Sequence, residues 1–325
     1  MSKNTGYVLI IGSSNMDFFI YSKRFPNPGE TVTGGSFKQF LGGKGANQAV
    51  ASVRSGSKTF FIGKIGTDVF GDQMISRLTD EGINMNHIIR DSKESSGVAF
   101  ILIDQNGENM ISVAPGANFN LKPEEIRSKA QLIKNANSIV VQMEIPIETI
   151  QEIFKIASEG NAIKILNPAP LKALPVDILS KVDIIIPNEG ELFRLYSLLG
   201  FKDVFGEKRQ KIFQISRDLA KLGLKYIITT LGKRGCLIFD KKNDKFYKVA
   251  APKVKTVDTV GAGDCFIGVL ASQLNKGIEI VNAAKFATMA ASIAVTRKGA
   301  QESMPFSNEI HNKLKDLKLN HSLKV

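Results

Sequence analysis

The feature that most constrains the fold is an alternation of short apolar runs with longer amphipathic stretches along the 325-residue chain. The apolar runs are rich in Ile and Val and are bounded by Gly, Asn or Pro, which is typical of strands buried inside a sheet. Strands are predicted at residues 7–11, 59–62, 138–142, 162–166, 183–186, 226–230 and 236–239. Helices are predicted at residues 46–54, 69–81, 146–158, 189–198, 208–222, 263–275 and 280–296. This order predicts an α/β fold with a mainly parallel central sheet flanked by helices in Rossmann-type layers.

Two segments, about 18–40 and 96–113, interrupt the alternation with β-like pieces that have no helix between them. Within the second, residues 97–103 and 109–113 flank a polar turn, which is typical of a hairpin. We expect the two segments to form a small separate β-sheet that acts as a lid beside a ligand crevice. No linker or change of composition marks a second domain, so residues 1–325 are predicted to form one domain with this lid.

The formal net charge of +12 raises the question of an anionic partner. The basic residues are scattered and no basic run is interleaved with aromatic residues, so we expect a solvated basic surface and no nucleic-acid partner. No apolar run approaches the roughly 20 residues that cross a bilayer, which argues against a membrane protein. The two cysteines, Cys236 and Cys265, lack metal-like spacing and predict no disulfide framework. A cytoplasmic location is expected, with the nucleus open for a eukaryotic chain.

The glycine-rich segment 258–264, Asp-Thr-Val-Gly-Ala-Gly-Asp, precedes an apolar helix and is the strongest chemical signal. Glycines let backbone N–H groups converge, and the start of a helix adds a positive dipole end, so the segment can hold a phosphoryl group. Asp264 could then accept a proton from an attacking hydroxyl. On spacing alone, a helix N-cap aspartate remains the alternative.

Two further segments carry polar side chains next to glycine or a strand end. The segment 42–48, Gly-Gly-Lys-Gly-Ala-Asn-Gln, is not a P-loop because Gly45 follows Lys44 where Ser or Thr is needed, but Lys44 and Asn47 could donate to hydroxyls or phosphate. The segment 12–17 puts Asn15 and Asp17 after the first strand, where open α/β sheets bind ligands. A plain tight turn and an Asx turn are the respective alternatives.

Together, the segments 42–48 and 258–264 resemble the signature pair of the PfkB sugar kinases, the ribokinase-like family. Six more stretches agree, at residues 28–33, 114–118, 166–170, 187–191, 230–235 and 294–301. The resemblance extends from about residue 7 to about residue 305, so joint chance occurrence is negligible. It implies ATP-dependent phosphorylation of D-ribose at O5, with a kinase for deoxyribose, fructose or a nucleoside as the alternative. A sugar-binding protein without activity and a nucleic-acid binder are rivals from other classes.

The resemblance also implies a role for individual residues. Asp264 would be the general base, and the anion hole for the γ-phosphate would comprise Gly261, Ala262 and Gly263. The sugar contacts would be Asn15, Asp17, Gly43, Lys44, Asn47, Glu144 and Asp264. Contacts to ATP would come from Asn188, Glu191, Thr230, Gly232, Gly235, Gly263 and Thr288. The loops for K⁺ would include Asp258, Thr259, Ala294, Arg297, Gly299 and Ser303.

Asn188 and Glu191 match an Asn-x-x-Glu motif that the family associates with Mg²⁺ and phosphate. Two positions depart from the family pattern. Thr288 stands where some members place a histidine near the adenine, and Cys265 stands where Thr, Ser or Ala is common. Cys265 is either a reactive thiolate favoured by the helix dipole or a small buried packing residue.

The resemblance further implies a homodimer in which two lids pair. The lid segments carry apolar side chains that are too large to leave in water. They comprise Phe18, Ile20, Val98, Phe100 and Leu102.

Overall fold

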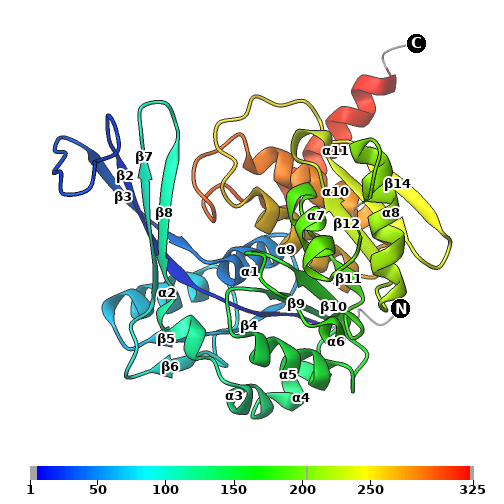
Figure 1. Cartoon of the computed structure of the whole chain (residues 1–325), viewed down its shortest axis with the longest axis horizontal. Helices are drawn as coiled ribbons and strands as arrows, with labels where there is room; N and C mark the ends of the chain where they lie inside the picture. Colours follow the sequence, from blue (N-terminus) through cyan, green and yellow to red (C-terminus); the bar gives the residue numbers. More distant parts are fainter. Residues whose placement is uncertain (1–5, 203, 323–325) are drawn as a thin grey trace.

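The computed structural model describes residues 6–202 and 204–322, and its centre is an eight-stranded sheet in the order β14-β13-β12-β11-β10-β9-β1-β4 (Figure 1). The strands are β1 (Val8–Ile11), β4 (Thr59–Ile62), β9 (Ser138–Gln142), β10 (Ile163–Asn167), β11 (Ile184–Ile185), β12 (Tyr226–Thr230), β13 (Cys236–Asp240) and β14 (Lys245–Val249). Neighbours from β4 to β12 pair in parallel, and β13 and β14 add antiparallel pairs at one edge. The predicted mainly parallel sheet is confirmed.

Helices cover both faces of this sheet, as Figure 1 shows. They are α1 (Lys44–Arg54), α2 (Val69–Asp80), α3 (Pro123–Arg127), α4 (Ala130–Lys134), α5 (Ile147–Ala157), α6 (Val176–Leu179), α7 (Glu189–Leu198), α8 (Lys208–Lys221), α9 (Ala262–Asn275), α10 (Ile280–Ala294) and α11 (Ser307–Ser322). In β1, Val8 and Ile10 pack in the cluster with α1, α9 and α10, whereas Leu9 and Ile11 pack in the cluster with α5, α7 and α8. Successive residues of a strand point to opposite faces, so both faces bury apolar area.

A second, four-stranded sheet in the order β3-β2-β7-β8 projects from the body (Figure 1). Its strands are β2 (Asn15–Tyr21), β3 (Ser36–Gly42), β7 (Gly97–Ile103) and β8 (Asn109–Ala114). β7 and β8 form the expected hairpin, in which the Asp104 carboxylate accepts the N–H groups of Asn106 and Glu108. A short sheet of β5 (Lys64–Gly66) and β6 (Ile89–Asp91) and the 3-10 turn η1 (Gly116–Asn120) lie at its base.

The sequence-based prediction missed some elements and placed some ends one or two residues away. β14 was missed because it is an antiparallel edge strand with exposed lysines, and α11 was missed because its sequence is largely polar. The helix α1 begins at Lys44, two residues before the predicted start, because Gly43 turns the chain with a φ of 85°. Within residues 6–202 and 204–322, no helix is both long and apolar enough to span a membrane.

Candidate active site

Asp264 lies in the first turn of α9 and is 7% exposed. Its Oδ2 accepts a hydrogen bond from Asn47 Nδ2 at 3.0 Å, and its Oδ1 accepts one from Gln48 Nε2 at 2.9 Å. The N-cap of α9 is Gly261, in the left-handed conformation, so the N-cap alternative for Asp264 is wrong. The carboxylate is instead held between the starts of α1 and α9, two helices that pack together.

Asp17 on β2 is a second carboxylate near Asp264, and it is half-buried. Burial is the largest cause that raises the pKa of Asp17 from 3.8 to about 7, followed by the charges of Glu144, Asp264 and Glu302. The Lys44 ammonium opposes this increase. A carboxyl pKa shifted this far is typical of a titratable group in a ligand-binding or catalytic site.

Glu144, which follows β9, joins the end of β1 to the start of α1. One of its carboxylate oxygens accepts the Ser13 hydroxyl and also the backbone N–H of Lys44, at 3.0 Å. The pKa of Lys44 is raised, mainly by the charge of Asp264 and further by Glu144. Lys44 is therefore the counter-charge of a cluster of acids, and such a set of carboxylates, amides and one ammonium can bind a polyhydroxylated ligand.

The side chain of Asn118 in η1 fixes the orientation of Asn15. Asn118 Oδ1 accepts the backbone N–H of Ser14 at 3.0 Å, and its Nδ2 donates to the backbone oxygen of Pro115 and to Asn15 Oδ1 at 2.8 Å. Because backbone groups set which end of the Asn118 amide is nitrogen, the atom of Asn15 that faces it is oxygen. Asn15 therefore presents its nitrogen to whatever binds on its other side.

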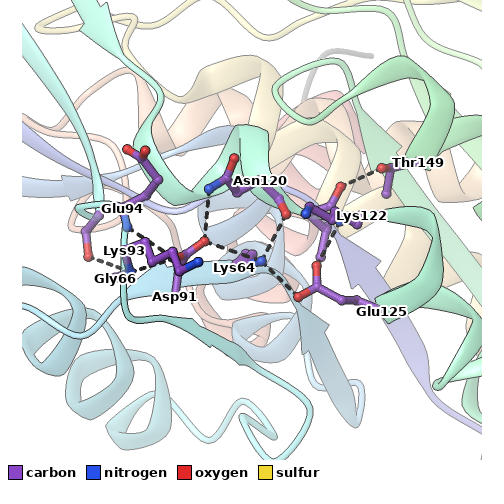
Figure 2. Close-up of polar contacts among 11 residues, drawn as sticks. Lys64, Gly66, Asp91, Lys93, Glu94, Asn120, Lys122, Glu125 and Thr149 are labelled. Carbon is purple, nitrogen blue, oxygen red and sulfur yellow. Dashed lines mark hydrogen bonds and ion pairs between the residues drawn. The ribbon is translucent and has the colours of Figure 1, made fainter.

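A buried ion cluster holds η1 in place, as Figure 2 shows. Lys64 Nζ lies 2.8 Å from Glu125 Oε1 and 3.3 Å from Asp91 Oδ2, and it donates to the backbone oxygen of Asn120 at 3.0 Å. The Asn120 amide also donates to Asp91. Removing one partner of a buried ion pair leaves an uncompensated charge, which is strongly destabilising. The cluster therefore anchors the segment that carries Asn118.

A cavity of about 1100 Å³ lies beside the start of α9 and is the candidate nucleotide site. Six of the seven residues that the resemblance assigned to ATP line it, namely Asn188, Thr230, Gly232, Gly235, Gly263 and Thr288. Thr288 is buried, with its hydroxyl 3.9 Å from the sulfur of Cys236. Residues 251–254, Thr256 and Phe266 also line the cavity, and the sequence analysis assigned them no role in the site.

Asn188 and Glu191 form a capping box at the start of α7. The Asn188 side chain accepts the N–H of Glu191, and Glu191 Oε2 accepts the N–H of Asn188, each at 2.8 Å. Burial raises the pKa of Glu191. Among the described residues, no group of three or more His, Cys, Asp and Glu could hold a metal. A single carboxylate near a phosphate site still fits Mg²⁺, which commonly binds through one or two carboxylates, water and substrate phosphates.

Asp258 joins the two loops that the resemblance assigned to K⁺. Its Oδ1 accepts the N–H of Val260 at 3.0 Å, and its Oδ2 accepts the N–H of Gly299 at 3.1 Å. The other assigned residues of the loops have separate contacts. Thr259 lines the large cavity, Ala294 ends α10 and accepts the N–H of Arg297, the Arg297 side chain pairs with Glu309, and Ser303 donates to the backbone oxygen of Ala300.

Comparisons with known proteins show the family of this chain. The pattern of the pfkB family carbohydrate kinases matches residues 5–307. The chain belongs to this family. It is 39% identical over 309 residues to a ribokinase of Staphylococcus aureus, covering 94% of this chain and 99% of that one. It is 37% identical to a deoxyribokinase of Salmonella typhi, covering 92% and 95%.

Solved structures of family members give the same result for the fold. The structure of Arabidopsis thaliana ribokinase complexed with ribose and ATP has a TM-score of 0.88 at 29% identity, and covers 95% of this chain and 99% of that one. A ribokinase of Giardia lamblia has a TM-score of 0.87 at 33% identity, and covers 96% and 99%. The predicted family and the ribokinase-like α/β fold with a small separate sheet are confirmed.

The prediction overlooked three amides of this pfkB family site, although each stands in or beside a segment that it singled out. Gln48 ends the glycine-rich motif, Asn118 ends the stretch 114–118, and Gln142 ends β9. The structure also decides between the two interpretations of Cys265. This thiol is fully buried, and burial raises its pKa to about 12, so the packing interpretation holds and the thiolate interpretation is wrong.

Proposed function

We propose that this chain transfers the γ-phosphoryl group of ATP to O5 of D-ribose. The observation that carries the proposal is the position of Asp264, which lies between a cluster of sugar-binding side chains and the wall of a cavity large enough for a nucleotide. A carboxylate at that junction can reach a hydroxyl that faces the terminal phosphate. The ribokinases to which the chain is similar support the same reaction.

In the proposed reaction, Asp264 takes the proton of the ribose O5 hydroxyl as the O5–phosphorus bond forms and the bond to ADP breaks. Gly261, Ala262 and Gly263 lie at the start of α9, where backbone N–H groups and the helix dipole would stabilise the charge that develops on the phosphoryl oxygens. Asn15, Asp17, Asn47 and Glu144 orient the sugar hydroxyls, and Lys44 balances their charge. Mg²⁺ held near Glu191 would neutralise the phosphate charge when bound.

A substrate panel tests the proposal. Phosphotransfer from ATP is measured with ribose, deoxyribose, fructose and a nucleoside at equal concentrations. We expect ribose to give the highest kcat/KM. A higher value with deoxyribose would favour the alternative that the similarity to a deoxyribokinase raises. Absence of transfer to every sugar would contradict the proposal as a whole.

K⁺ is expected to activate the enzyme, because Asp258 ties the two loops together directly before the anion hole. A cation held by loop carbonyls would keep the N–H groups of Gly261–Gly263 aligned with the phosphoryl group before it arrives. K⁺ sheds its water more readily than Na⁺ for such carbonyls, so kcat/KM should be higher in K⁺. The comparison is made at matched ionic strength with a bulky organic cation as the reference.

The variant Asp258→Ala is expected to blunt this activation. Asp177→Ala, which removes an exposed carboxylate on α6, is the matched control and should respond to K⁺ as the wild type does. Equal kcat/KM in K⁺, Na⁺ and the organic cation would contradict the prediction.

The small sheet is proposed to be a lid that pairs with the lid of a second copy. Phe18, which was expected to be part of an open apolar face, is half-buried and packs on Phe70 of α2. Ile111 and Val113 on β8 remain 59% and 53% exposed, and the strand register puts them on the same face as Asp17. Apolar side chains exposed beside a binding site are typical of a surface that a partner covers.

The double variant Ile111→Lys/Val113→Lys is therefore expected to convert a dimer into a monomer at micromolar concentration. Val176→Lys puts a charge on an exposed apolar side chain of α6, outside the small sheet, and serves as the control. Light scattering gives the mass of each protein. A monomeric wild type with full activity would contradict the predicted dimer.

A further inference from the structure

A chain of buried side-chain amides ends on Asp264. Gln142 Nε2 donates to Gln48 Oε1 at 2.6 Å, and Gln48 Nε2 donates to Asp264 Oδ1 at 2.9 Å. Both glutamines are 0% exposed. Buried polar groups are costly unless they are hydrogen-bonded, so two fully buried glutamines in line with one carboxylate require a reason beyond packing.

The orientation of the Gln48 amide is fixed from two sides. A carboxylate only accepts hydrogen bonds, so the nitrogen of Gln48 must face Asp264. Asn167 Oδ1 accepts from the same nitrogen at 3.3 Å, and the nitrogen of Asn167 donates to the backbone oxygen of Ile186 at 3.1 Å. Both N–H groups of Gln48 are thereby used, and its oxygen is left to accept from Gln142.

A second amide chain reaches the other oxygen of Asp264. Gln301 Nε2 donates to Asn47 Oδ1 at 3.1 Å, and Asn47 Nδ2 donates to Asp264 Oδ2 at 3.0 Å. The helices that carry these groups approach closely, because a Cβ on Gly268 of α9 would lie 2.2 Å from the backbone oxygen of Gln48. With one donor on each oxygen, the carboxylate cannot rotate without breaking a hydrogen bond.

We propose that Gln48, locked by Gln142 and Asn167, is a positioning residue that holds Asp264 at the angle at which it meets the substrate hydroxyl. The proposal rests on the proposed function, in which Asp264 is the general base. One donor on each oxygen leaves a lone pair on each oxygen available for the incoming proton. Gln48 reaches the reaction only through Asp264.

The variant Gln48→Leu tests this role, because leucine has a similar size but donates no hydrogen bond. At saturating ribose and ATP, kcat is expected to fall by roughly 10-fold through loss of orientation, with KM for ATP changed by less than about 2-fold. The acid limb of kcat against pH should also move to higher pH. A carboxylate that loses a donor holds its proton more tightly, and a base must be deprotonated to act.

The other charged groups that act on Asp264 are Lys44 of α1, Asp17 of β2 and Glu191 of α7. They are the same in wild type and variant, so the difference between the two profiles reports the lost amide. Gln273→Leu is the matched control. It removes a buried glutamine from α9 that bonds to Ser55 at 3.1 Å and has no hydrogen bond to Asp264, and its pH profile should match the wild type.

Gln142→Leu gives a second test that leaves Gln48 and Asp264 intact. Without the donor on its oxygen, Gln48 is free to turn, so a smaller shift in the same direction is expected. If folded Gln48→Leu has the same kcat–pH profile as the wild type, the proposal is overturned. If Gln48→Leu does not fold, the same result for Gln142→Leu overturns it. Near-normal turnover of Asp264→Asn would instead remove the base assignment and with it the proposed function, so the two failures are distinguishable.

Discussion

Replacing Asp264 by Asn is expected to lower kcat by roughly 10²–10⁴-fold, because the ribose hydroxyl then has no base to take its proton. The change keeps the shape of the side chain, and KM for ribose is expected to change far less than kcat. Steady-state kinetics at saturating ATP separates the two parameters.

The amide environment adds a complication that the measurement must control. In Asp264→Asn, the new nitrogen faces either Asn47 or Gln48, both of which donate to the wild-type carboxylate, so one of these amides must turn. Thermal melting shows whether the fold tolerates this. Asp240→Asn is the matched control, since Asp240 is a buried carboxylate on β13 whose partner is Asn243, and it should keep full activity. Near-normal turnover of Asp264→Asn would contradict the base assignment.

Replacing Asp17 by Asn is expected to make the ligand-free protein more stable while it loses activity. The pKa of Asp17 is raised to about 7, mainly by burial, so the folded state disfavours the ionised carboxylate. Below about pH 3 the carboxyl is protonated in both folded and unfolded chains, and it costs nothing. The cost grows as the pH increases from the unfolded pKa of 3.8 to the folded pKa of about 7, and above that it stays constant, on the order of 2–4 kcal/mol.

Asparagine is neutral at every pH, so Asp17→Asn removes that cost. Its melting temperature should exceed that of the wild type by several degrees at pH 8, and the gap should close toward pH 4. The value of kcat/KM for ribose is expected to fall about 100-fold, because a charged hydrogen bond to the sugar is lost. Calorimetry across this pH range measures the gap. A gap that does not depend on pH, or a variant less stable than wild type at pH 8, would contradict the prediction.

Such a trade between stability and binding is common in ligand sites. A group that is poorly solvated in the free protein regains its hydrogen bonds when the ligand arrives. Asp17 is therefore expected to lower the stability of the ligand-free protein and to contribute to ligand binding.

The sequence by itself determined the layers of the fold and the main chemical groups. Short continuous apolar runs mark strands such as 59–62 and 138–142, because a strand buried on both faces of a sheet is apolar throughout. Glycine-rich segments mark the helix starts at Lys44 and Ala262, because only glycine allows the turns there. These signals depend only on residues that are close in sequence, so the amino-acid sequence alone is enough to recognise them.

Tertiary structure alone decided which groups meet. Gln48 and Asp264 are 216 residues apart in sequence, and Asn118 and Asn15 are 103 apart. No local pattern encodes such contacts, because they depend on how α1 packs on α9 and on where η1 is anchored. The state of Cys265 was decided in the same way. Its helix position favours a thiolate, but burial between packed helices outweighs the dipole and keeps the thiol protonated.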